Sequence, residues 1–172
     1  MRNFVDMAAR QKASQLFRDF ISGNISNDAF EDQIPITHDR AIDAVWSTSW
    51  VFYDDFKEHK LEGRDRLPPD QKRACIRWLL FLQSDLLYEW PAIYLPGMDP
   101  VSRTRPNFWR RLISSHKFLD ESVVSDFINA GHYPVWPFIS VRDYKQAISN
   151  PLLLSGKSNL PKNNRAKSSI SK

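Results

Sequence analysis

Apolar residues recur along this chain every three to four positions, which is the period of a helix that buries one face. The first such stripe ends at Ser22 and Gly23, a pair that favours a helix stop. It contains Phe4, Met7, Ala8, Ala13, Leu16, Phe17 and Phe20. A second, short helix is predicted with Asn27 or Asp28 as its N-cap, and it should end before Pro35.

The apolar pattern is widest between residues 37 and 59, which predicts a long central helix. The next helix is predicted to begin at Pro69, because proline lacks only a donor that would have no partner in a first turn. That helix must end by Trp90, since the residue before a proline is disfavoured in the α conformation. Its stripe is Ile76, Leu79, Leu80, Gln83 and Leu87, with Leu87 expected to point inward like Phe56 of the central helix.

Three further helices are predicted in the second half of the chain, over residues 108–115, 121–130 and 141–149. Gly131 closes the second of these, and Ser140 with Asp143 forms a capping pair for the third. No run alternates apolar and polar residues between turn signals, as an exposed strand would. We therefore predict an all-α fold, a single-domain helical bundle of about six to seven helices over residues 1–155.

Charge is distributed unevenly, and this changes the interpretation of the high isoelectric point of about 9.3. Residues 156–172 hold five basic residues and no acidic one, and their polar composition predicts a disordered basic tail. Without this tail the chain is nearly neutral, so the isoelectric point alone does not indicate a nucleic-acid partner. No signal peptide or membrane-length apolar run is found, and the single cysteine, Cys75, suits a reducing compartment. We expect a cytoplasmic protein without a membrane partner.

Two acidic stretches are the main candidates for function: "YDDFKEHKLEG" at residues 53–63 and "SDLLYEWP" at residues 84–91. One hypothesis is a metal-dependent enzyme built on Asp55, His59, Asp85 and Glu89. The chain lacks the Glu-x-x-His pairs that helical-bundle metal sites use, so we expect neither a metal nor another cofactor. A second hypothesis is a solvated helix end, in which Lys57 and Lys60 balance the acidic residues.

The third hypothesis is a docking surface, where acidic side chains surround aromatic anchors. It predicts exposed carboxylates on one side of the bundle, near the aromatic residues Tyr53, Tyr88 and Trp90. If the two helices form an antiparallel hairpin, the two acidic stretches are five turns apart, and two separate acidic surfaces are the expected outcome. The candidate partner-binding residues are Asp54, Asp55, Glu58, Glu62, Asp85, Tyr88, Glu89 and Trp90.

A basic segment, "SRTRPNFWRRLISSHK" at residues 102–117, has Phe108 and Trp109 between its arginines. This arrangement is also typical of nucleic-acid binding. The aromatic residues share one helical face with Leu112 and Ile113, however, which favours burial against the bundle over base stacking. Nucleic-acid binding is therefore kept as an alternative function.

The chain resembles small helical bacterial immunity proteins of contact-dependent growth inhibition systems. The resemblance lies in "ISGNISNDAFEDQIP", "VWSTSWVFYDDFKEHKLEG" and "RWLLFLQSDLLYEWP", and it covers residues 16–91. It implies a non-enzymatic protein that binds and neutralises a cognate toxin domain in the cytosol, often a basic nuclease. An acidic surface would compete with nucleic acid for such a toxin and would speed association.

Overall fold

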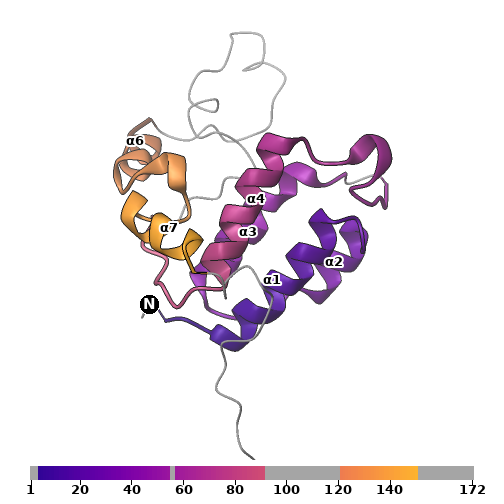
Figure 1. Ribbon diagram of the computed structural model, residues 1–172, viewed down its shortest axis with the longest axis horizontal. Helices are drawn as coiled ribbons and strands as arrows, with labels where there is room; N and C mark the ends of the chain where they lie inside the picture. Colours follow the sequence, from indigo (N-terminus) through magenta and orange to yellow (C-terminus); the bar gives the residue numbers. More distant parts are fainter. Residues whose placement is uncertain (1–3, 55–56, 92–120, 151–172) are drawn as a thin grey trace, which may run out of the picture.

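The computed structural model describes residues 4–54, 57–91 and 121–150, and the regular secondary structure of these residues is entirely helical. Figure 1 shows α1, α2, α3 and α4 packed together, with α6 and α7 on the other side of α4 from α2. The all-α prediction is confirmed. The helices are α1 (Met7–Ile21), α2 (Asn27–Gln33), α3 (Arg40–Ser49), α4 (Pro69–Leu82), α6 (Glu121–Asn129) and α7 (Val141–Ile148).

The first two helices begin and end close to their predicted limits. The Asp6 carboxylate caps α1 by accepting the Ala9 N–H, and Ser22 ends the helix. Gly23 then adopts a φ of 74°, a left-handed conformation that favours glycine. The cap of α2 was predicted one or two residues too late, because the Ser26 side chain is the N-cap and Asn27 already belongs to the helix.

The prediction of one long helix over residues 37–59 is wrong. Helix α3 ends at Ser49 and is followed by a single 3-10 turn, Trp50–Phe52, after which Tyr53 is extended. The apolar spacing is compatible with a longer helix, but backbone groups of Asp54, Lys57 and His59 bond to Asn27 instead of to one another. Tertiary hydrogen bonds thus replace the local helical ones.

Helix α4 begins at Pro69 as predicted but ends at Leu82, well before Trp90. The Ser84 hydroxyl donates to the Phe81 carbonyl, and Arg10 donates to the carbonyls of Ser84 and Leu86, so these acceptors are not used by a continuing helix. The prediction that Leu87 points inward is wrong, since its side chain is exposed. Phe56 lies outside the described residues.

The last two described helices match their predicted positions. Helix α7 has the predicted capping pair: Ser140 Oγ accepts the Asp143 N–H at 3.2 Å and donates to the Asp143 carboxylate at 2.6 Å. Before it, the proline-rich segment forms a 3-10 turn, Tyr133–Val135. The helix predicted over residues 108–115 and the predicted tail over residues 156–172 lie outside the described residues.

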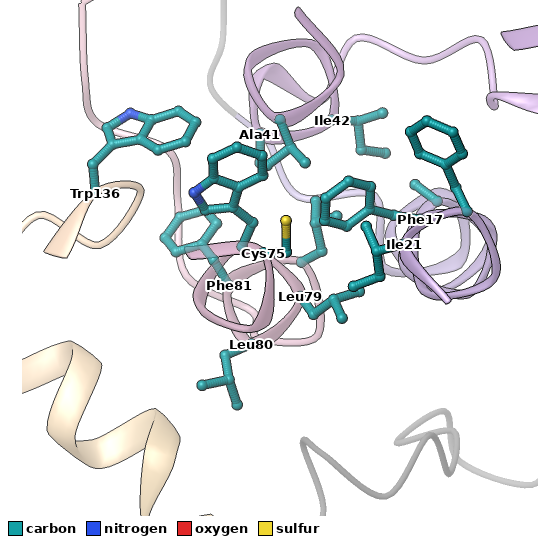
Figure 2. Close-up of a cluster of buried hydrophobic side chains, with 14 of the residues drawn as sticks. Phe17, Ile21, Ala41, Ile42, Cys75, Leu79, Leu80, Phe81 and Trp136 are labelled. Carbon is teal, nitrogen blue, oxygen red and sulfur yellow. The ribbon is translucent and has the colours of Figure 1, made fainter. Parts of the chain in front are cut away.

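The core is rich in aromatic residues, and α4 is at its centre. Figure 2 shows Phe17 and Ile21 of α1 facing Leu79 of α4, with Cys75 between α4 and α3 and Leu80 on the opposite side of α4. Phe20 and Phe30 stack with ring centroids 4.7 Å apart, which joins α1 to α2. Burying these side chains supplies the main stabilising term of the fold.

A second part of the core connects the segment after α4 to the last third of the chain. Trp90 is fully buried, donates its indole N–H to the Pro137 carbonyl at 3.0 Å, and packs on Phe127 of α6. The Trp136 indole N–H donates to the Tyr88 hydroxyl at 3.1 Å. These contacts attach residues 121–150 to α4 as part of one core.

Two buried groups in this core predict a loss of stability in alkali. Burial raises the pKa of Cys75 and of Tyr88 to about 12, from ordinary values of 9.0 and 10.0. Between these values each group is ionised only in the unfolded chain, which binds fewer protons, so the free energy of unfolding falls as pH rises. We expect urea midpoints to be flat from pH 7 to 8.5 and to fall from pH 9 to 11. Tyr88→Phe should reduce the fall above pH 10, and an unchanged slope in this variant would contradict the assignment.

Candidate functional site

The first acidic stretch is a loop held against the start of α2 by one buried side chain, Asn27. The Asn27 amide oxygen accepts the backbone N–H of His59 at 2.7 Å, and its amide nitrogen donates to the carbonyls of Asp54 and Lys57 at 3.3 and 3.4 Å. The Asn27 backbone N–H donates to the His59 carbonyl at 3.0 Å. A single residue therefore fixes the backbone at three positions of the loop.

Tyr53 brings the loop close to the acidic residues of α2. Its hydroxyl donates to the Asn27 carbonyl in a short hydrogen bond. The pKa of Tyr53 is raised above its ordinary value first by burial and then by the neighbouring carboxylates of Glu31 and Asp28. These two residues of α2 therefore lie beside the loop.

Two further contacts extend this surface. The Ser26 hydroxyl donates to the Glu58 carboxylate at 2.5 Å, and Glu62 lies beside the turn after α1, where a side-chain carbon added to Gly23 would be 3.3 Å from the Glu62 Cβ. The loop and α2 thus present their carboxylates around the same end of α1. We call this the acidic face; its described members are Asp28, Glu31, Asp32, Asp54, Glu58 and Glu62, all exposed.

The acidic face has an excess of negative charge. Its six carboxylates are accompanied in the loop by Lys57 and Lys60, and within the described part of the chain neither Glu58 nor Glu62 forms a salt bridge. An exposed group of carboxylates with this excess charge favours the approach of a basic partner. The three residues of α2 were not predicted as site residues, because the hydrogen bonds that bring α2 to the loop leave no periodic pattern in the sequence.

The other predicted carboxylates, Asp85 and Glu89, are exposed but belong to a different surface. Arg10, which binds the carbonyls next to Asp85, lies near the start of α1, whereas the acidic face surrounds its far end, about 20 Å along the helix. Figure 1 shows that the segment before α4 and the segment after it lie at opposite ends of that helix. Asp85 and Glu89 therefore lie apart from the acidic face, which agrees with the expectation of two separate acidic surfaces, and Asp55 lies outside the described residues.

The two predicted aromatic anchors beside Asp85 are not accessible. Tyr88 is 6% exposed and Trp90 is 0% exposed, and both pack inside the chain's own core. The prediction that these two aromatic residues anchor a docking surface is therefore wrong. After α4 the side chains alternate between buried and exposed, so that Tyr88 and Trp90 are buried whereas Asp85, Leu87 and Glu89 are exposed.

A different set of aromatic residues adjoins the acidic face. Trp46, Trp50 and Tyr53 are each half-buried and contact one another, with the Trp50 and Tyr53 rings stacked at a centroid distance of 5.0 Å. Trp46 also contacts Phe30 of α2, edge to face at 5.1 Å. Trp46 and Trp50 fall within the wide apolar pattern of residues 37–59 and were not predicted as site residues. Their signal was an aromatic residue at every third or fourth position.

A cavity of about 350 Å³ lies beneath the loop, and its lining includes Asp54, His59 and Asp65. Both ring nitrogens of His59 are within hydrogen-bonding distance of backbone carbonyls, those of Lys57 at 3.2 Å and Phe52 at 3.1 Å. In residues 4–54, 57–91 and 121–150 no three histidine, cysteine or acidic side chains are placed to hold a metal ion. His59 belongs to the loop before α4, whereas Asp85 and Glu89 follow the end of that helix. Asp55, the fourth residue of the metal hypothesis, lies outside the described residues.

No model of a known protein family, no curated protein and no solved structure matches this chain. None of the helices in the described ranges is long and apolar enough to span a bilayer. The basic segment 102–117, on which the nucleic-acid hypothesis depends, lies outside the described residues.

Proposed function

We propose that this protein is a non-enzymatic immunity protein that binds a basic toxin domain, such as a nuclease, in the cytosol through its acidic face. The observation that carries the proposal is the loop before α4, where the carboxylates of Asp54, Glu58 and Glu62 are exposed while Asn27 bonds to the backbone at residues 54, 57 and 59. A surface that is already ordered loses little conformational entropy on binding, so more of the interaction energy appears as affinity.

The aromatic group beside the acidic face supplies the second requirement of such an interface. Trp46, Trp50 and Tyr53 are partly accessible and rigidly packed, and tryptophan and tyrosine are the residues most often found as energetic centres of protein interfaces. A partner that covers this group would bury apolar area there, while the carboxylates of α2 and the loop would pair with its basic residues. The resemblance to immunity proteins supports a toxin as that partner.

The proposal predicts that charge reversal on the acidic face slows association with the toxin. The binding partner in the test is the product of the gene immediately upstream of this chain's gene, which the proposal requires to be a toxin effector. We expect Asp32→Lys combined with Glu62→Lys to lower the association rate constant by roughly tenfold or more at low salt, because electrostatic steering is lost. Surface plasmon resonance at two ionic strengths measures this effect. The melting temperature should change little, since exposed charges contribute little to stability.

The chain offers a matched control at its other acidic surface. Asp85→Lys combined with Glu89→Lys changes the net charge by the same amount, but at the opposite end of α4. This control should leave the association rate within about twofold of the wild type. Equal slowing by both pairs would show a general charge effect, and no slowing by the first pair would exclude the acidic face. A neighbouring gene product without toxicity, or one that does not bind this chain, would exclude the immunity function.

A further inference from the structure

A second cavity, of about 420 Å³, lies between α4 and the turn at residues 133–135. Its volume is within the range of about 300–1,000 Å³ that is usual for small-molecule sites in proteins. Val51 and Gln71 are exposed parts of its lining, whereas Phe52, Trp78 and Trp136 are buried parts. The cavity is therefore apolar and aromatic in depth and reaches solvent at its edge.

One cation, Arg77, lies in this lining. Its Nε donates to the Trp136 carbonyl at 2.6 Å, which fixes the plane of the guanidinium. Its two terminal nitrogens donate to no group of the described chain, and no carboxylate lines the cavity. Burial lowers the pKa of Arg77 from its ordinary value, as expected for a cation partly removed from water without a counter-charge. The guanidinium thus keeps free the edge with which arginine binds carboxylates bidentately.

Trp78 contributes a second unpaired donor to the same lining. Its side chain is 6% exposed, and its indole N–H has no acceptor in the part of the chain that the structure describes. A buried donor without a partner is unfavourable, and a ligand that brings an acceptor removes this penalty. An apolar cavity with one buried unpaired indole N–H, the terminal nitrogens of a half-buried guanidinium and no acidic side chain selects an anionic acceptor on an apolar body.

We propose that this cavity binds a small organic carboxylic acid, with the carboxylate on the terminal nitrogens of Arg77 and the apolar body against Phe52, Trp78 and Trp136. Nε is engaged by the Trp136 carbonyl, so the carboxylate binds through the two terminal nitrogens. The site is independent of the acidic face and of the proposed toxin. A bare inorganic anion would satisfy the donors but would leave the aromatic walls without a partner.

The test uses 3-phenylpropionate and its neutral amide, 3-phenylpropanamide, two probes of nearly equal shape. The full chain, labelled with ¹⁵N, is titrated while the indole N–H signals of its tryptophans are followed by NMR, and Trp78→Phe assigns the Trp78 signal. We expect the acid to shift that signal saturably, with a dissociation constant below about 1 mM, and the amide to bind at least tenfold more weakly. Inorganic phosphate should bind more weakly than the acid.

Variants on α4 separate recognition of the charge from simple occupation of the cavity. Arg77→Gln should weaken binding of the acid roughly tenfold or more, with little effect on the amide, whereas Arg73→Gln, on the exposed side of the helix, should leave both unchanged. Equal affinity for the acid and the amide in the wild-type chain would overturn the proposal without any variant. So would phosphate binding as tight as that of the acid, or a Trp78 signal that does not move.

Discussion

Asp39→Asn is expected to lower the free energy of unfolding by about 3–5 kcal/mol, the usual cost of removing one member of a buried ion pair. Asp39 and Arg10 are 1% and 0% exposed, and they meet through two hydrogen bonds of 2.6 and 3.0 Å. Asparagine keeps one acceptor oxygen but places an NH2 donor at the other position, where it faces N–H donors. It also leaves the guanidinium buried without a counter-charge. Urea unfolding monitored by circular dichroism measures the change.

The effect is large because this ion pair joins three distant parts of the chain. Asp39 caps α3 by accepting the Ala41 N–H and also accepts the Asp6 N–H at the start of α1. Arg10 donates to the carbonyls of Ser84 and Leu86 and lies over the Phe81 ring at 5.4 Å. Loss of the charge on Asp39 therefore weakens the junction of α1, α3 and the segment after α4.

Two comparisons identify the uncompensated charge as the cause. Asp43→Asn, on the exposed side of α3, should change the free energy of unfolding by less than about 0.5 kcal/mol. The double variant Arg10→Met with Asp39→Asn should be more stable than Asp39→Asn alone, because it removes the unpaired guanidinium. A cost below about 1 kcal/mol for Asp39→Asn would contradict the electrostatic explanation.

Helices with a clear start or stop signal were predictable from the sequence. Pro69 marks the start of α4, Ser22 and Gly23 mark the end of α1, and Ser140 marks the start of α7. Local signals failed where a distant polar residue competes for backbone groups. Asn27 does so after Phe52 and Arg10 does so after Leu82, and in both places the apolar period continues although the helix does not.

The candidate site was predictable in its charge but not in its composition. The exposed acidic residues of the loop follow from their sequence clustering, whereas the contribution of α2 depends on contacts between residues about thirty positions apart. The aromatic residues were assigned wrongly for a similar reason: Tyr88 and Trp90, predicted as anchors, are core residues, whereas Trp46 and Trp50 adjoin the acidic face. An aromatic residue among acidic ones can be an anchor or a core residue, and only packing against Phe127 and Trp136 shows that Trp90 and Tyr88 belong to the core.

Asn27→Ala is expected to lower the free energy of unfolding by about 2–3 kcal/mol, because it leaves a partly buried donor and two carbonyls without partners. The His59 N–H loses its 2.7 Å acceptor, and the carbonyls of Asp54 and Lys57 lose their common donor. Hydrogen exchange at the His59 amide measures the local consequence: protection should fall further there than in α4. Asn24→Ala, an exposed amide in the turn before α2, is the matched control and should cost less than about 0.5 kcal/mol.

The same variant separates the order of the loop from its charge in the proposed interaction with a toxin. Asn27→Ala removes no charge, so electrostatic steering and the association rate should be nearly unchanged. The loop must then be ordered on binding, and this cost should appear as dissociation roughly tenfold faster than from the wild-type chain. Charge reversal at Asp32 and Glu62 should have the opposite signature, with slower association as its main effect. If Asn27→Ala loses protection at His59 but dissociates from the toxin at the wild-type rate, the loop is not part of the interface.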